Sequence, residues 1–427
     1  MGPDDPGIRW EIIGSDLKDQ LPAPPFASES IPLTILILLA NRGITNSEEI
    51  KQFLNPSLDQ LPPPQLLLGM ARAVAILAEA RESQTPVLIH GDYDADGVTA
   101  TALLTKFFRE IGVPVYSHLP DRVSDGYGLK LESLSTLRNL PGLSEHPAPI
   151  LLTVDCGITN LSEIAAAKAM GFRVIVTDHH QPGPELPDAE AIINPHQPGC
   201  TFSFHDLSGV GVAFYLAAGL RAELVRLGVW AKNEQPNLRK LLDLVAIGTV
   251  ADMVPLRGAN RILVKVGLEV INLSPGPGIK AMLEQIGHGS GKVTAETIAF
   301  QLAPRLNAAG RTGSAEHALQ LLLAEEEIPT QILALSLSQA NDLRKDITEV
   351  MYREARLQAV SQITEGRLAL VVAGEDWYQG IAGLVAAKLA REFWRPTVVL
   401  ALDAAGPARC GDRFRPGTIQ PPHPPGL

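Results

Sequence analysis

Three acidic residues alternate along one short stretch of this sequence and constrain its fold more than any other feature. Asp92, Asp94 and Asp96 lie within residues 90–97, directly after the apolar run 86–89. Carboxylates packed this closely repel one another unless cations or hydrogen bonds compensate, and divalent metals are the usual compensators. The stretch therefore predicts a metal site at the end of a buried strand.

The segments around this stretch follow a repeating strand-then-helix order. Short aliphatic runs predict the strands, and apolar residues at helical spacing predict the helices between them. This alternation is typical of an α/β fold built on a parallel sheet with helices on both faces. The predicted strands span residues 87–90, 113–116, 150–154 and 174–177, and the predicted helices span 66–81, 98–111 and 164–170.

Two further predicted strands end in possible metal ligands. Asp155 follows the third strand, and Asp178, His179 and His180 follow the fourth. Open parallel sheets bind ligands beyond the carboxyl ends of their strands, so these side chains are expected at the same edge as the first three acids. Oxygen and imidazole donors without thiolates suit Mn²⁺ or Mg²⁺ better than structural zinc.

Two later segments carry polar residues whose role the chemistry alone leaves open. Asp252 follows a long apolar segment, and a lone acid at such a place is more often a helix cap than a ligand. The segment 302–311 contains Arg305, Asn307 and Arg311 among small residues, which suits a close approach of the backbone to a phosphate. Solvated arginines on a loop are the alternative interpretation of that segment.

The last third of the sequence predicts a long helix and a small second α/β unit. At 427 residues the chain exceeds what one hydrophobic core usually supports, so two or three domains are expected. Residues 330–365 contain neither Gly nor Pro and predict a helix that connects two domains, followed by strands at 368–372 and 396–400 around a helix start at 380–383. The predicted divisions are an N-terminal arm with the start of the first domain (1–65), the first α/β domain (66–328), the connector helix (329–366), a partial second domain (367–408) and an irregular tail (409–427).

The composition excludes several classes of protein. A formal net charge of −11 argues against a protein that coats nucleic acid through bulk electrostatics, although a metal site can supply local positive charge for a phosphodiester substrate. The longest apolar run, 35–40, is far shorter than the ~20 residues that span a bilayer, and the N-terminus lacks the layout of a signal peptide. A cytoplasmic location is predicted. The three cysteines are scattered and form no C-x-x-C pair.

Three familiar motifs are only partly matched. The stretch 90–97 matches the start of a calcium-binding EF-hand loop, but Leu103 stands where the final Glu belongs, and a strand precedes it. A phosphate-loop pattern fails at Ile286 and Val293. The pair of glycines in Gly209-Val210-Gly211 lacks the third glycine of a dinucleotide fingerprint. Neither nucleotide-binding interpretation is supported.

Taken in order and spacing, the candidate ligands resemble a known superfamily. The stretches 90–97, 154–157, 178–180 and 251–252 resemble the four motifs of the DHH phosphoesterases. The resemblance covers about residues 30–402. Segments that narrow it to the single-stranded-DNA-specific exonucleases are Pro120-Asp121-Arg122 with Gly126-Tyr127-Gly128, the segment 305–311 and the region of Gly380.

The resemblance implies a two-metal hydrolase that degrades single-stranded DNA from its 5′ end in DNA repair and recombination. It implies a parallel-sheet DHH domain joined by a long helix to a smaller DHHA1-type α/β domain. Single-strand-binding protein and a helicase are implied partners, and no membrane is involved. The implied metal ligands are Asp94, Asp96, Asp155, His179 and Asp252, with Asp155 as the bridge. The resemblance also implies that Asp92 and Asp178 orient ligands and that His180 faces the scissile phosphate. The residues implied to hold substrate phosphates are Arg122, Arg305, Asn307 and Arg311.

The sequence departs from the family pattern at its C-terminal end. Residues 409–413 replace a Gly-Ser-x-Arg-Ser segment that contacts DNA phosphates, and a C-terminal oligonucleotide-binding domain is missing. These departures predict a truncated or frameshifted reading frame. His90 is a metal ligand in some relatives. The alternative functions are a DHH phosphodiesterase acting on short oligonucleotides or cyclic dinucleotides, and a non-catalytic DHH scaffold.

Overall fold

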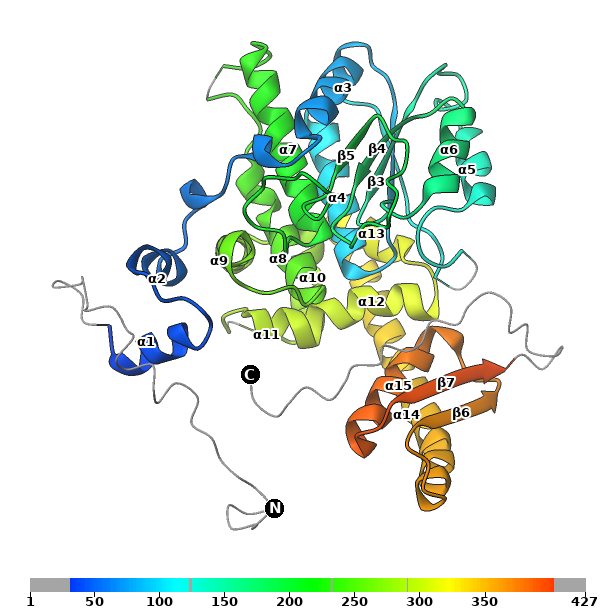
Figure 1. Ribbon diagram of the computed structural model, residues 1–427. Coiled ribbons are helices and arrows are strands. Elements are labelled where there is room, and N and C mark those ends of the chain that lie inside the picture. Colours follow the sequence, from blue (N-terminus) through cyan, green and yellow to red (C-terminus); the bar gives the residue numbers. More distant parts are fainter. Residues whose placement is uncertain (1–30, 123–124, 232, 290, 403–427) are drawn as a thin grey trace.

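Two α/β units joined by one long helix make up the protein (Figure 1). The structure, a computed structural model, describes residues 31–122, 125–231, 233–289 and 291–402. The predicted arm within residues 1–30 and the predicted tail, including residues 409–413, lie outside the described residues.

The first unit is built on a five-stranded parallel sheet with the strand order β2-β1-β3-β4-β5. Its central strands are continuous aliphatic runs because both faces of the sheet are covered. The neighbouring strands β1 and β3 pair from Val87 opposite Ile150 to Gly91 opposite Val154. This sheet confirms the predicted fold class. The strands are β1 (Val87–Gly91), β2 (Val115–His118), β3 (Ile150–Val154), β4 (Arg173–Thr177) and β5 (Ala191–Ile193).

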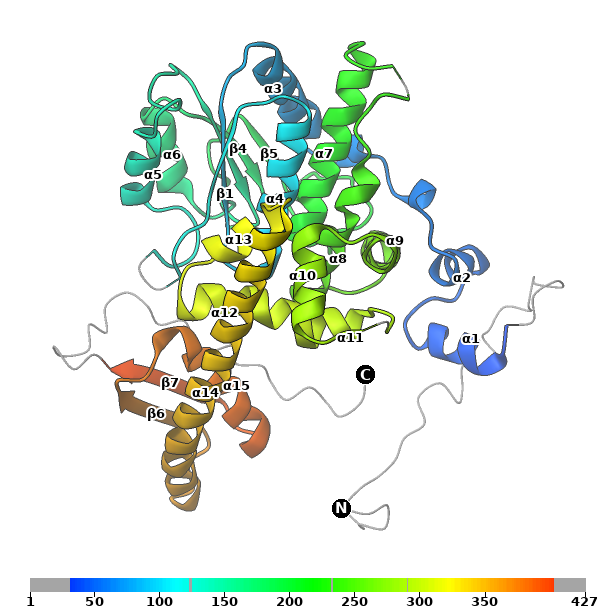
Figure 2. The same ribbon diagram turned by 180° about the vertical axis from the view of Figure 1, so that it is seen from behind.

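Helices cover both faces of this sheet, as Figures 1 and 2 show from opposite sides. On one face Ile89 and Leu152 join the core formed with α3, α4 and α7. On the other face Leu88 and Leu151 pack with α5 and α6. These helices are α3 (Met70–Glu82), α4 (Ala95–Glu110), α5 (Leu131–Arg138), α6 (Leu161–Ala169) and α7 (Gly209–Arg226).

Further helices complete the first unit on the side of α4 and α7. In α12, Pro304 lies in the first turn, where a missing N–H costs nothing, and Leu302 and Leu306 are buried. The interpretation of segment 302–311 as a loop is therefore wrong, and its backbone N–H groups are engaged in the helix. The helices are α1 (Leu33–Ala40), α2 (Ser47–Leu54), α8 (Leu242–Ala251), α9 (Gly258–Leu273), α10 (Pro277–Gln285), α11 (Ala295–Thr297), α12 (Ala303–Thr312) and α13 (Glu316–Leu323), with 3-10 turns η2 (Leu58–Gln60), η3 (Pro64–Leu66) and η4 (Leu238–Leu241) and the π-helical turn η5 (Ile298–Leu302).

The predicted connector is the 38-residue helix α14 (Glu327–Thr364), which packs on α12 and runs on into the second unit (Figure 2). That unit holds the parallel pair β6 (Leu370–Glu375) and β7 (Thr397–Leu402) with α15 (Gln379–Phe393). It has its own core, which includes Leu370, Val372 and Leu389. The arrangement confirms a smaller α/β unit after a long helix, whereas the exact domain boundaries remain predictions.

Two glutamines of α14 pair with the free edge of β6. Val371 and Ala373 direct their backbone groups away from β7. The Val371 N–H donates to Gln362 Oε1 at 3.0 Å, and its carbonyl accepts from Gln362 Nε2 at 2.6 Å. Ala373 makes the same two bonds with Gln358, at 3.1 and 2.8 Å. The helix thus takes the place of a neighbouring strand and satisfies an edge that would otherwise be open.

Among the described residues, no single helix is long and apolar enough to cross a membrane, although one sharply bent pair, Leu58–Leu66 with Met70–Glu82, meets the requirement of length and composition.

Candidate metal centre

The topology of the sheet places the predicted ligands at one location. In the order β2-β1-β3-β4-β5 the chain leaves β1 toward one side and β3 toward the other, so a crevice opens between the carboxyl ends of these two strands. Asp92 follows β1 and Asp155 follows β3, and His179 follows the adjacent β4. The sequence-predicted acids from separate strands therefore meet at the switch point of the sheet.

The turn from β1 into α4 holds the first three acids. Asp94 is the N-cap of α4 and accepts the backbone N–H of Asp96 at 3.0 Å and of Gly97 at 3.2 Å. These bonds explain why the helix begins at Ala95 and not at the predicted Val98. A Cβ on Gly97 would lie 2.4 Å from the backbone oxygen of Asp92, so only glycine fits this tight turn.

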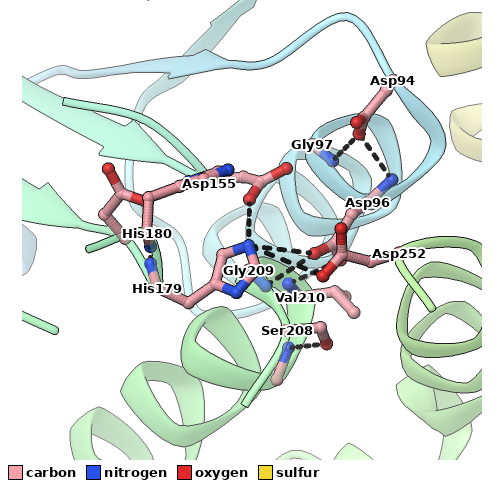
Figure 3. A network of polar contacts seen from close by, with 12 residues as sticks. Asp94, Asp96, Gly97, Asp155, His179, His180, Ser208, Gly209, Val210 and Asp252 are labelled. Atoms are coloured by element: carbon pink, nitrogen blue, oxygen red, sulfur yellow. Dashed lines mark hydrogen bonds and ion pairs between the residues drawn. The ribbon is translucent and has the colours of Figure 1, made fainter. Parts of the chain in front are cut away.

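The carboxylate of Asp96 is held by the N-terminus of α7. The backbone N–H of Gly209 donates to its Oδ2 at 2.6 Å, and that of Val210 donates to its Oδ1 at 2.9 Å (Figure 3). Ser208 caps the helix by accepting the N–H of Gly211 at 3.2 Å. The partial positive charge of this helix end fixes Asp96 in place without consuming all of its lone pairs.

The imidazole of His179 lies among three carboxylates. Its Nε2 is 3.0 Å from Asp155 Oδ1, 3.7 Å from Asp252 Oδ2 and 3.9 Å from Asp96 Oδ2 (Figure 3). Burial, the charge on His180 and other neighbours lower the pKa of His179 to about 4, so its ring is neutral at pH 7. A neutral ring that also bonds the Leu207 backbone can offer a nitrogen lone pair to a metal.

The nitrogen and oxygen donor atoms of the centre do not satisfy one another, and they suit bound divalent cations. His179 Nε2, Asp155 Oδ1 and Asp92 Oδ1 are buried and have no hydrogen-bond partner. Burial and neighbouring carboxylates raise the pKa of Asp92, Asp96 and Asp155, and burial with Asp94 raises that of Asp252 to about 7. Bound cations would pair with these buried atoms and would also offset the repulsion among the carboxylates. Within the described part of the chain, three groups of donors lie close enough to hold an ion: Asp92, Asp94 and Asp155; Asp96, His179 and Asp252; and Asp155, His179 and His180.

Asp155 belongs to two of these groups and carries an unusual backbone. Its φ is +61°, in the left-handed region that an aspartate adopts at some cost. A Cβ on the neighbouring Gly209 would lie 2.5 Å from Asp155 Oδ1 and 2.6 Å from its Cγ. Close packing of α7 against this side chain thus requires a glycine, and it fixes the carboxylate between the two strand ends.

His180 is oriented by a buried carboxylate. Asp178 Oδ1 lies 2.7 Å from His180 Nδ1 and also accepts the backbone N–H groups of His179 and His180, while its Oδ2 accepts the N–H of Ile158. Burial by itself would lower the pKa of His180, but the hydrogen bond with Asp178 and the surrounding acids raise it to about 9. His180 is therefore a partly exposed cation at pH 7, and the hydroxyl of Tyr127 lies 3.1 Å from its Nδ1.

The predicted phosphate-binding residues divide into two kinds. Arg122 lies over the ring of Tyr93, with its guanidinium carbon 4.8 Å from the ring centroid, close to the metal centre. Arg311 donates to the backbone oxygen of Gly380 at 3.1 Å and so links the two units. Arg305, nearer the start of α12, donates to Ser338 Oγ of α14 at 3.2 Å.

Asn307, in contrast, is committed to the architecture of the centre. Its Oδ1 accepts the backbone N–H of Ala95, at the N-terminus of α4, at 2.8 Å. The contact ties α12 to the turn that carries Asp94 and Asp96. The side-chain oxygen of Asn307 is thus used within the protein, although the residue was predicted to bind phosphate.

Several contributors to the centre escaped prediction. Gly209 supplies a backbone N–H and leaves room for Asp155, and its only sequence signal was the glycine pair that fails as a dinucleotide fingerprint. The Tyr127 hydroxyl beside His180 lies in a glycine-flanked loop, and its role was not predicted.

His90 is buried and stacks on His118, and its Nε2 has no hydrogen-bond partner. It lies outside the three donor groups found among the described residues.

Comparison with known proteins identifies the same superfamily. Residues 86–249 match the model of the DHH family, N-terminal domain. The chain is 38% identical to the single-stranded-DNA-specific exonuclease RecJ of Bacillus subtilis over 93% of its own length. It spans 48% of that protein, and thus only about half of this relative's length.

Solved structures agree with this similarity. A crystal structure of exonuclease RecJ bound to manganese superposes with a TM-score of 0.69 at 36% identity, covering 80% of this chain and 81% of that one. RecJ of Thermus thermophilus in complex with Mn²⁺ gives a TM-score of 0.70 at 34% identity, covering 85% of this chain and 49% of that one. With the motifs, the fold and the extent of these matches in agreement, the chain belongs to the RecJ family of DHH proteins.

Proposed function

We propose that this chain is a metal-dependent exonuclease that hydrolyses the phosphodiester bonds of single-stranded DNA in the 5′-to-3′ direction, acting in the cytoplasm in DNA repair and recombination. The observation that carries the proposal is the convergence of Asp96, Asp155 and Asp252 on His179 Nε2, at 3.0 to 3.9 Å. The relatives named for single-stranded-DNA-specific exonuclease activity support the substrate.

The proposed cofactors are two Mn²⁺ or Mg²⁺ ions. Asp94, Asp96, Asp155, His179 and Asp252 would hold them, with Asp155 shared, since it groups with Asp92 and Asp94 and its Oδ1 also lies 3.0 Å from His179 Nε2 of another group. Asp92 lies within one of these groups as well, so it is a candidate for a direct ligand and not only for support. When bound, such ions would polarise the scissile phosphate, lower the pKa of an attacking water and stabilise charge on the leaving oxygen.

The chain's own residues would orient the substrate. His180, held as a cation by Asp178, would face the scissile phosphate and offset charge that develops on it. Arg122 and Arg311 would bind phosphates beside the centre, and Arg305 one farther away. Asn307 would act indirectly by holding the N-terminus of α4. Single-strand-binding protein and a helicase are proposed partners.

Cleavage of end-labelled oligonucleotides tests this function. Wild-type protein with Mn²⁺ is expected to release nucleotides first from the 5′ end of a single strand, and much more slowly from a blunt duplex. Asp155→Ala is expected to lower the rate about a hundredfold or more, because it removes the shared carboxylate. Asp188→Ala is the matched control, since Asp188 is exposed and pairs with Lys168 at the surface.

Two results would contradict the proposal. One is release of nucleotides first from the 3′ end, and the other is cleavage that Asp155→Ala leaves at the rate of Asp188→Ala. Much faster cleavage of a dinucleotide than of a long strand would instead favour a phosphodiesterase for short substrates. No Mn²⁺ uptake and no cleavage would favour a scaffold.

A further inference from the structure

Helix α14 brings another arginine, Arg344, close to the predicted phosphate-binding residues. Helices α12 and α14 lie side by side, and the Arg305 Nε donates to Ser338 Oγ of α14 at 3.2 Å. Two turns farther along both helices, Arg311 lies within electrostatic range of Arg344 of α14 and of Arg122. The charges of Arg122 and Arg344 therefore both act on Arg311, and we call these three residues the arginine group.

Arg344 is the member of this group whose Nε has no hydrogen-bond partner among the described residues. Its side chain is half-buried, and its Nε is fully buried without a hydrogen-bond partner. Over residues 31–122, 125–231, 233–289 and 291–402, no carboxylate lies within ion-pair distance of it. The charge of Asp342 acts on Arg344, but its Oδ1 lies 2.9 Å from Lys345 Nζ and pairs with that lysine.

A second polar group on the same face of α14 is unsatisfied. Asn341 precedes Arg344 by one helical turn, is only 1% exposed, and its Oδ1 has no hydrogen-bond partner. Unpaired buried polar groups cost free energy, and a half-buried cation next to the like charge of Arg311 costs more. The charge of Asp342 acts on Arg344, but Asp342 pairs with Lys345, so an anionic ligand bound at this place would stabilise the Arg344 guanidinium further.

A purely structural role explains these features less well. An arginine can bury its aliphatic stem and leave its charged end in water. That arrangement would keep the Nε hydrated, whereas here this atom is buried and unpaired. It would also give no reason to hold Arg344 close to Arg311.

We propose that Arg344, together with Arg311, forms a subsite for a backbone phosphate of the single strand, distinct from the scissile phosphate at the metal centre. The proposal rests on the proposed function for the identity of the strand. The subsite makes α14 part of the substrate-binding surface as well as a connector.

Binding of a 12-nucleotide dT oligomer, measured by fluorescence anisotropy in chelator at several salt concentrations, tests the subsite. Arg344→Ala is expected to weaken binding about tenfold, as for loss of a charge-assisted hydrogen bond. Its plot of log affinity against log salt should be shallower by about 0.7, the contribution of one phosphate contact in a single strand. Arg344→Lys should restore the salt dependence but not the full affinity.

The matched control is Arg353→Ala on the same helix, since Arg353 is exposed and pairs with Glu349. Arg353→Ala removes the same charge and should bind the oligomer with the affinity and the salt dependence of the wild-type protein. Equal effects of Arg353→Ala and Arg344→Ala, or an unchanged salt dependence in Arg344→Ala, would overturn the proposal. Thermal melting of each variant separates lost binding from lost folding, and Arg344→Lys provides the test if Arg344→Ala unfolds.

Turnover separates this proposal from the proposed function. With Mn²⁺, Arg344→Ala should raise KM for the 12-mer and leave its kcat nearly unchanged. A fall in kcat with an unchanged KM would contradict a binding subsite. If wild-type protein cleaves no single strand at all, the proposed function fails, and the binding measurements in chelator still decide whether Arg344 contacts phosphate.

Discussion

Replacing Gly209 by alanine tests how closely α7 must approach the metal centre. The added methyl carbon would lie 2.5 Å from Asp155 Oδ1 and 2.6 Å from its Cγ. Carbon atoms prefer a separation of about 3.5 Å from their neighbours, so the Asp155 carboxylate must shift by about 1 Å. The backbone at Gly209 has no positive φ, so the effect is one of space and not of backbone strain.

The expected loss is mainly one of catalysis. A displacement of about 1 Å in a positioned group can cost about a hundredfold in rate, and crowding in a packed site costs about 1–3 kcal/mol of folding free energy. Gly209→Ala should therefore lower kcat about a hundredfold and weaken Mn²⁺ binding in calorimetry, while the protein stays folded by circular dichroism.

The control for this variant is Gly383→Ala on α15. A Cβ there meets nothing within 4 Å, so this variant should keep full activity and gain slightly in stability, by about 0.5–1 kcal/mol. If Gly209→Ala keeps the kcat and the Mn²⁺ affinity of Gly383→Ala, α7 does not position Asp155 and the steric reasoning is refuted.

Two further predictions concern stability. The folded pKa of Asp252, about 7, lies above the unfolded value of 3.8, so its ionised form destabilises the metal-free fold above about pH 7 and this penalty disappears as the pH falls toward 4. Asp252→Asn should raise the melting temperature in chelator at pH 8 and lose this advantage near pH 4; an equal gain at both pH values would contradict the electrostatic cause. The double variant Gln358→Ala, Gln362→Ala removes four hydrogen bonds at the β6 edge and should lower the free energy of unfolding of the second unit by about 2 kcal/mol or more in urea, whereas Gln320→Ala, a surface glutamine, should not.

The sheet and the strand ends could be predicted because each leaves a local signal. Strands buried on both faces are continuous aliphatic runs, and the acids and histidines directly follow them. The strand β5 has only three residues, too few for a pattern, and was not predicted. The strand β2 begins at Val115 rather than at 113, since Pro114 cannot donate to the ladder.

Other features of the centre depend on contacts that the sequence does not display. Asp252 was predicted from chemistry to be a cap, and its backbone N–H does bond to Gly248 at the end of α8, yet its carboxylate also lies 3.7 Å from His179 Nε2. The packing of α8 against α4 and α7, together with the contact of α7 with β4, brings these groups together. The helix α12 was not predicted, because the segment 302–311 was interpreted from its polar residues alone, whereas burial of its apolar face decides the structure.

Counting the bound metal ions tests the central claim most directly. Isothermal titration of the metal-free protein with Mn²⁺ should give two ions per chain, and electron paramagnetic resonance of the loaded protein should show the coupled spectrum of a close pair. Asp155→Ala should abolish the coupling, whereas Asp188→Ala should retain both ions. Binding of a single ion by the wild-type protein, or a coupled pair that survives in Asp155→Ala, would contradict a two-metal centre shared through Asp155.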